Sequence, residues 1–212
     1  MYYPVFINLQ GRSTLVVGGG AVAERKVETL VEAGARVTVV APEATPRLLE
    51  WSAAGTVTLK LKPFEDSDVD GHWLVVAATD DPATQQAAHA SGARRHVLVN
   101  VVDQPDLCDF IVPSIARRGD VVVAVSTSGQ SPALAAALRA RIEGMLPDDV
   151  ARVARVLGSL REEARCRLAD AEERKRAFER VIASGILDWI REYDDAGALT
   201  RARRLMGLDA GS

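Results

Sequence analysis

The sequence lacks the long apolar run and the charge excess that would indicate a membrane protein or a nucleic-acid binder. It contains no stretch of about 18 uncharged apolar residues, so we expect no transmembrane helix. Lysine and arginine number 26 against 29 aspartates and glutamates, which gives a formal net charge of −3. Binding to nucleic acid needs a clear excess of basic residues. We therefore expect neither a nucleic-acid nor a membrane partner.

Cysteine and histidine are also scarce. Cys108 and Cys166 are the two cysteines; they form no C-x-x-C pair, so neither a disulfide framework nor a structural zinc site is predicted. The three histidines, which show no metal-ligand spacing, are His72, His89 and His96. The first ten residues lack a basic segment and a long apolar run, so we expect no signal peptide and predict a cytoplasmic location.

The first hundred of the 212 residues alternate short apolar runs with amphipathic helical patterns. Strands are predicted at residues 13–17, 36–41, 57–61, 73–78 and 97–101. Helices are predicted between them, at residues 24–33, 45–54 and 82–91. Strands that alternate with helices favour an α/β fold with a parallel sheet covered on both faces.

The pattern changes after Asp103. Two extended runs, 110–115 and 120–126, flank an Arg117–Gly119 turn region and could form an antiparallel pair. A helix is predicted from Pro132, which suits a first helical position, to about Met145. Nearly all of the chain from Asp149 onward has helical periodicity.

A glycine-rich turn lies between the first predicted strand and the first helix. Gly18, Gly20 and Ala23 match the pattern G-x-G-x-x-G/A. Gly18 allows the tight turn, Gly20 allows the backbone to approach a pyrophosphate, and Ala23 allows the helix to pack closely on the strand. The helix N-terminus then offers N–H groups to an anion. The alternative is a glycine turn without a ligand.

An acidic residue for the ribose hydroxyls of NAD is expected at the end of the second strand. That position is Val40-Ala41-Pro42, and Glu43 follows as a substitute. Arg47, further along, would favour the 2′-phosphate of NADP. The pattern therefore leaves NAD and NADP open.

Three further segments contribute to the prediction. Ala78-Thr-Asp-Asp81 and Asn100-Val-Val-Asp103 follow strands, where ligands bind in open parallel sheets. Ser128-Gly-Gln-Ser-Pro132 begins a later helix. Together with Pro4-Val-Phe6, Phe110-Ile-Val-Pro-Ser114 and the glycine turn, these residues resemble the precorrin-2 dehydrogenase/sirohydrochlorin ferrochelatase family, including the N-terminal half of bifunctional siroheme synthase.

The resemblance implies that NAD⁺ accepts a hydride from precorrin-2 to give sirohydrochlorin, and that some members also insert Fe²⁺ to give siroheme. It implies a homodimer with three parts: a Rossmann-type NAD-binding domain (1–112), a small α+β dimerisation domain (113–146) and a helical C-terminal domain (147–212). Two alternatives are an NAD(H)-sensing regulatory module and a chelatase without redox activity.

The resemblance also assigns site residues. Asp103 corresponds to the catalytic aspartate, and a carboxylate beside a nicotinamide would serve as a general base; its alternative role is to cap a turn before Pro105. Cofactor contacts are assigned to Gly18, Gly19, Gly20, Ala21, Val22, Ala23, Pro42, Glu43, Thr79, Asp80, Asn100 and Val102. For Thr79 and Asp80 the alternative is capping of the following helix.

The implied substrate is a polycarboxylate, so a binding site needs cations or N–H donors. Arg117 and Arg118 are the preferred candidates, with hydroxyls of Thr127 and Ser128 as further contacts. A turn-and-cap role before Pro132 is the alternative for these two hydroxyls. The arginines of the C-terminal region alternate with glutamates, which favours a solvated face with pairs at i,i+4.

Overall fold

The computed structural model describes residues 2–209. The chain divides into two compact units, and the boundary between them falls between Val112 and Pro113. Each unit contains its own hydrophobic core.

A five-stranded parallel sheet with the strand order β3-β2-β1-β4-β5 forms the centre of the first unit. Its elements in chain order are β1 (Ser13–Val17), α1 (Ala21–Glu32), β2 (Arg36–Ala41), α2 (Pro46–Ala53), β3 (Thr58–Leu61), the 3-10 helix η1 (Asp66–Val69), β4 (Leu74–Ala77), α3 (Pro82–Arg95), β5 (Leu98–Val101) and the 3-10 helix η2 (Pro105–Leu107). The predicted Rossmann-type α/β fold is confirmed.

Helices cover both faces of this sheet. Val27 of α1 and Leu48 of α2 pack with Val16 and Val39 on one face. Ala88 of α3 packs on the other face, in the cluster that contains Leu15, Val40 and Val99. Neighbouring residues of one strand therefore enter different cores, because side chains alternate across a strand.

Helix α3 is longer than the periodicity predicted. It begins as expected at Pro82, where the carboxylate of Asp81 accepts the N–H groups of Ala83 and Thr84. It continues past Ser91 to Arg95 and ends at His96, whose φ is +55°. Arg94 and Arg95 pair with Asp66 of η1. This tertiary contact lies outside any local pattern, which explains the wrong boundary.

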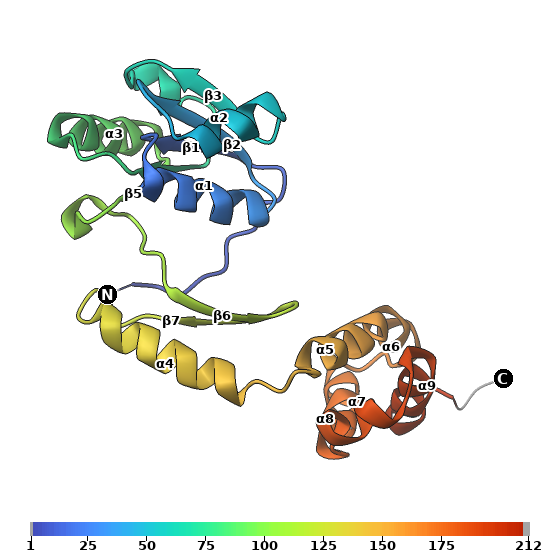
Figure 1. Cartoon of the computed structure of the whole chain (residues 1–212). Coiled ribbons are helices and arrows are strands. Elements are labelled where there is room, and N and C mark those ends of the chain that lie inside the picture. Colours follow the sequence, from blue (N-terminus) through green and yellow to red (C-terminus); the bar gives the residue numbers. More distant parts are fainter. Residues whose placement is uncertain (1, 210–212) are drawn as a thin grey trace. The chain divides into compact units, whose positions relative to one another are not determined.

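The second unit begins with a β-hairpin, β6 (Ser114–Arg118) and β7 (Val121–Val125), which are antiparallel. The predicted pair is confirmed, but its boundaries were wrong. Arg117 and Arg118 belong to β6 instead of the turn, because Gly119, at a φ of +57°, allows a tight connection at Gly119–Asp120. Helix α4 (Pro132–Met145) lies along the hairpin (Figure 1).

A bundle of short helices completes this unit: α5 (Val150–Ser159), α6 (Arg161–Arg167), α7 (Ala171–Ala183), α8 (Ile186–Trp189), the 3-10 helix η3 (Ile190–Glu192) and α9 (Asp195–Met206) (Figure 1). Val156, Leu160, Val181, Ile190 and Met206 are buried in its core. Over residues 2–209, no helix combines the length and apolarity needed to cross a bilayer.

Candidate functional site

The loops after four strands meet at the carboxyl edge of the parallel sheet. The N–H of Gly18 donates to the Val40 carbonyl at 2.9 Å, which joins the loops after β1 and β2. The N–H of Ala78 donates to Val17 at 2.7 Å, and that of Val102 to Ala77 at 2.9 Å. The edge thus brings together the glycine turn and the segments that follow β2, β4 and β5, as expected where parallel strands end side by side.

Each of the three glycines of the turn has a different environment. Gly18 has a φ of +122°, and a Cβ there would lie 2.2 Å from the Ala78 carbonyl oxygen. A Cβ on Gly19 would lie 1.9 Å from the Glu43 carbonyl oxygen. A Cβ on Gly20 would have no atom within 4 Å. Gly18 and Gly19 are therefore required by the protein's own backbone, whereas the space at Gly20 is open to a ligand.

Helix α1 begins beside that open space. No side chain caps its first residues, and Gly20 is the N-cap. Ala21 and Val22 are exposed, whereas Ala23 is fully buried. The exposed N-terminus can bind an anion through backbone N–H groups, because these have no partner within the helix. Ala23 contributes by packing, since its side chain has no surface for a ligand.

The end of β2 presents one acidic side chain. Pro42 and Glu43 are exposed, and no residue in the described part of the chain pairs with the Glu43 carboxylate. Arg47 lies nearby in sequence but is engaged elsewhere: its guanidinium contacts Glu28 at 2.6 Å and Glu24 at 3.6 Å. It also lies 4.6 Å from the centre of the Trp51 ring.

The end of β4 combines structural and accessible groups. The Thr79 hydroxyl accepts a hydrogen bond from the N–H of Asp81 at 3.3 Å. The Thr79 carbonyl accepts one from the side-chain amide of Gln85 at 2.7 Å. Thr79 therefore holds the start of α3, as its alternative role required. Asp80 is exposed and has no hydrogen bond among residues 2–209, so its carboxylate is available at the edge.

Asp103 follows β5 in an unusual backbone conformation. Its φ is +60°, in the left-handed region that few residues other than glycine, asparagine and aspartate adopt. The side chain is exposed, and its carboxylate accepts no hydrogen bond from any described residue. The structure therefore gives Asp103 no capping role, and it leaves the carboxylate free to act on a ligand.

The two other candidates after β5 face inward. Asn100 is 8% exposed, and its amide donates to the Phe110 carbonyl at 2.9 Å. Val102 is half-buried and packs against the core beneath α1 and α2. Neither side chain is free at the carboxyl edge, so only their backbone could contact a cofactor.

The two arginines of β6 lie on opposite faces of the hairpin. Arg118 is on the face that α4 covers, and it contacts Glu143 at 3.4 Å. Arg117 is exposed and forms no ion pair within residues 2–209. The adjacent Ile115 is 41% exposed, and Ala116, on the covered face, is buried. Of the two predicted cations, only Arg117 is accessible and unpaired.

The loop before α4 uses one of its two candidate hydroxyls internally. The Thr127 hydroxyl donates to the Ser131 carbonyl and accepts its N–H, both at 3.0 Å. Ser128 has a φ of +53° and is exposed, and its hydroxyl has no partner in the part of the chain described. Ser128 is thus the hydroxyl available to a ligand, and Thr127 shapes the turn.

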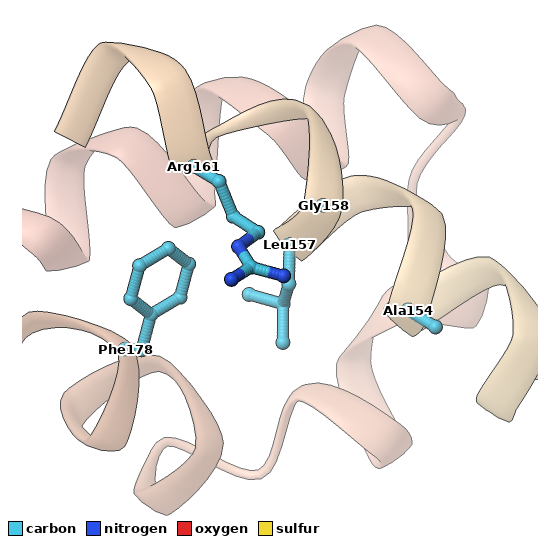
Figure 2. Close-up of a pocket in the computed structure, with 5 residues that line it drawn as sticks. All are labelled: Ala154, Leu157, Gly158, Arg161 and Phe178. Carbon is cyan, nitrogen blue, oxygen red and sulfur yellow. The ribbon is translucent and has the colours of Figure 1, made fainter. Parts of the chain in front are cut away.

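The helical bundle contains an open groove of about 430 Å³ between α5 and α7. Ala154, Leu157 and Gly158 line it from one side and Phe178 from the other, and Arg161 reaches across between them (Figure 2). Arg161 has no ion pair among the described residues, in contrast to the pairs Arg165–Glu162 and Arg167–Glu163. From helical periodicity, Arg161 was expected on a solvated face together with these paired arginines. Nothing in the sequence pattern indicated the groove.

Metal-binding groups do not gather in the described residues. No group of three or more histidines, cysteines, aspartates and glutamates is close enough there to hold an ion. Cys108 instead lies under the loop after β5, where its sulphur is within hydrogen-bonding distance of Val101 and Gln104. Sequence spacing gave no indication of this contact.

Two family models match the chain. The model described as "Putative NAD(P)-binding" covers residues 5–114, which is more than half of the sequence. The model described as "Sirohaem biosynthesis protein central" covers residues 118–145. The first match spans the Rossmann-type unit and the second spans most of the hairpin and α4.

Siroheme synthases are similar to most of the chain. That of Escherichia coli O157:H7 is 41% identical over 199 residues, which cover 94% of this chain and 44% of that protein. That of Methylococcus capsulatus is 47% identical over 182 residues, covering 85% and 38%. The chain therefore spans less than half the length of these relatives.

A solved structure described as "SirC, precorrin-2 dehydrogenase" has the same fold. It superposes with a TM-score of 0.76 at 25% sequence identity, over 96% of this chain and 100% of that one. The similarity thus includes the sheet, the hairpin and the helical region.

Proposed function

Because the chain belongs to the NAD(P)-binding family matched over residues 5–114, we propose that it is an NAD-dependent dehydrogenase that oxidises precorrin-2 to sirohydrochlorin in siroheme biosynthesis. The names of the similar siroheme synthases and of the similar precorrin-2 dehydrogenase supply the substrate. The observation that supports the proposal best is an accessible carboxylate, Asp103, unpaired among the described residues, at the same sheet edge as a glycine turn with open space at Gly20.

The carboxyl edge suits a dinucleotide. The open space at Gly20 and the uncapped N-terminus of α1 would accept the pyrophosphate through backbone N–H groups. Glu43 would accept hydrogen bonds from the adenosine ribose hydroxyls. Bound NAD⁺ supplies the hydride acceptor of the reaction. Ala21, Val22, Pro42 and Asp80 would border it, and Asn100 and Val102 would contribute backbone only.

NAD is preferred to NADP in this proposal because of Glu43 and Arg47. A free carboxylate at the end of β2 would repel a 2′-phosphate. Arg47, a nearby cation that would offset this repulsion, is instead paired with Glu24 and Glu28. We expect NAD⁺ to bind at least about tenfold more tightly than NADP⁺. Glu43→Gln would reduce this difference.

Asp103 is the proposed general base. The oxidation removes one hydride and one proton from precorrin-2, and a base near the reacting carbon is needed for the proton. The Asp103 carboxylate accepts no hydrogen bond within the described residues, so its lone pairs remain available. The left-handed backbone conformation is the kind of local strain that occurs at functional sites.

The substrate's carboxylates would bind to groups of the second unit. Arg117 is the accessible cation of the hairpin, and Ser128 is the available hydroxyl. Arg118 and Thr127 support these positions through their contacts with Glu143 and Ser131. Replacing Arg117 with Gln should raise KM for precorrin-2 and leave the affinity for NAD⁺ unchanged.

We further propose that the hairpin and α4 pair with a second copy of the chain. The hairpin exposes Ile115 on the face that α4 does not cover, and α4 itself exposes Leu134, Leu138 and Met145. Leu138→Glu should convert a dimer to a monomer in light scattering. The proposal would be wrong if the wild type were already monomeric at micromolar concentration.

Iron insertion is a second activity that the same carboxylate would support, because the pyrrole N–H protons of sirohydrochlorin must be removed as Fe²⁺ enters. Fe²⁺ is here a substrate rather than a resident cofactor. The test is to add Fe²⁺ or Co²⁺ to sirohydrochlorin and to follow the tetrapyrrole spectrum with wild type and with Asp103→Asn.

The main experiment mixes the protein with enzymatically made precorrin-2 and NAD⁺ and records NADH and the tetrapyrrole spectrum. We expect Asp103→Asn to lower kcat by about 10²- to 10⁴-fold with little change in stability, since asparagine also tolerates a positive φ. Asp106→Asn, a change to an exposed carboxylate in the same loop, is the matched control.

NAD⁺ binding without NADH formation from either NAD⁺ or NADP⁺ would overturn the dehydrogenase proposal. It would favour the NAD(H)-sensing module, or, if metal insertion persisted, a chelatase without redox activity. The cytoplasmic location stays a prediction.

A further inference from the structure

The segment after β5 folds back along this strand, which is the last in the sheet order. The N–H of Asp109 donates to the Val99 carbonyl at 2.8 Å, and the N–H of Val99 donates to the Asp109 carboxylate at 2.9 Å. One residue further along each segment, the side-chain amide of Asn100 donates to the main-chain carbonyl of Phe110 at 2.9 Å. Residues 108–110 thus act as a partner for the edge strand and close the loop that contains Asp103.

The Cys108 thiol contacts the residues on either side of the turn that contains Asp103. Its sulphur lies 3.2 Å from the Val101 nitrogen, from which it accepts the N–H. It also lies 3.1 Å from the Val101 carbonyl oxygen and 3.2 Å from that of Gln104, so the S–H can donate to either. Burial raises the pKa of the Cys108 thiol, which keeps this proton in place at neutral pH.

These contacts involve residues before and after Asp103 in the chain. The N–H of Gln104 donates to the Val101 carbonyl at 3.2 Å and closes a turn that contains Asp103 at a φ of +60°. The thiol then contacts the residues at both ends of this turn. Aspartate adopts the left-handed region more readily than most residues, and these contacts favour that conformation over the extended one. The thiol is the side chain that connects the two ends.

We propose that Cys108 is a positioning residue for Asp103: it holds the turn that presents the Asp103 carboxylate at the carboxyl edge of the sheet. The role rests on the proposed function, in which Asp103 is the base. It differs from a redox or nucleophilic role, because a half-buried thiol that stays protonated is a poor nucleophile. Its chemistry here is that of a hydrogen-bonding side chain.

The test compares Cys108→Val with Cys108→Ser. Valine has a similar volume but cannot hydrogen-bond, so the Val101 N–H loses its acceptor; serine keeps a donor and an acceptor. We expect Cys108→Val to lower kcat about 10- to 100-fold without changing the Kd for NAD⁺. Cys108→Ser should restore most of the activity. Cys166→Val, at an exposed site on α6, is the matched control.

Two further measurements separate positioning from general stability. In an Asp103→Asn background, Cys108→Val should cause little additional loss of kcat, because residues that act through one another are not additive. Hydrogen exchange at the Val101 and Gln104 amides should become faster in Cys108→Val and remain slow in Cys108→Ser.

Equal activity of Cys108→Val and wild type would overturn the proposal, as would fully additive losses in the double variant. Unchanged hydrogen exchange would show that the thiol does not hold the turn. If the wild type formed no NADH, the proposed function would fail and the catalytic part of this inference with it, while the exchange data would still decide whether the thiol holds the turn.

Discussion

The backbone is held in place differently in two regions of the molecule: the carboxyl edge of the sheet in the first unit, and the helical bundle in the second. At the edge, main-chain atoms approach each other so closely that Gly18 and Gly19 have no room for a Cβ. In the bundle, Gly158 has no atom within 4 Å of such a position, and the order comes from packed side chains such as Leu160 and Ile190.

Arginines pair with carboxylates in both regions, as Arg47 does with Glu28 and Arg152 with Asp195. In the bundle, several arginines also donate to main-chain carbonyls of other segments: Arg152 to Ile190 and Tyr193, Arg167 to Leu208, and Arg180 to Leu205 and Met206. These donors satisfy carbonyls that helix ends leave unpaired.

The difference explains where reactive groups can be accommodated. Because the backbone holds the edge of the sheet, side chains such as Asp80 and Asp103 need no structural role and stay accessible. In the bundle, polar side chains such as Arg152 and Arg180 connect separate segments, whereas Arg161 has no ion pair among the described residues. Three experiments test whether the two regions differ in this way.

The largest effect is expected from Gly18→Ala. The new Cβ would collide with the Ala78 carbonyl at a φ of +122°, so the free energy of unfolding should fall by at least about 3 kcal/mol. Gly20→Ala, which meets open space, should keep the wild-type stability but weaken NAD⁺ binding about tenfold, or 1.4 kcal/mol. Urea unfolding and cofactor titration measure the two effects. If both variants were equally stable, close main-chain contacts would not be what holds the carboxyl edge in place.

Arg152→Met should destabilise the bundle less. It removes hydrogen bonds to Ile190 and Tyr193 and the ion pair with Asp195, at a cost of about 1–3 kcal/mol. Arg155→Met, on the exposed face of the same helix, should change stability by less than about 0.5 kcal/mol. Fluorescence of the buried Trp189 reports on this region during urea unfolding. Similar losses in both variants would show that the carbonyl contacts contribute nothing specific.

The smallest effect concerns pH. All three histidines lie in the first unit, and burial lowers the pKa of His72 below its ordinary value of 6.5. Between pH 7 and 5 the unfolded chain therefore takes up a proton before the folded protein does, so stability falls as the pH falls. His72→Gln should flatten this dependence in the first unit. The thermal transition of the bundle, followed through Trp189, should not respond to the substitution.

Local patterns predicted much of this protein. The alternation of strands and helices predicted the parallel sheet, and G-x-G-x-x-A predicted the glycine turn between β1 and α1, because both depend on neighbours in sequence. The family resemblance read from the motifs is confirmed by the two family models and by the similar siroheme synthases. The candidate roles of individual residues, and the division into three domains, stay predictions.

Strand periodicity and backbone sterics act over a few residues, so the order of amino acids is enough to predict which segments form the sheet and where its glycines must lie. Which polar side chains remain available depends on contacts that form only in the folded chain. Asn100, Arg47 and Arg118 looked as accessible as Asp103, but partners distant in sequence engage each of them: Phe110, Glu28 and Glu143. Hydrogen bonds and ion pairs depend on distance in space, which periodicity does not encode.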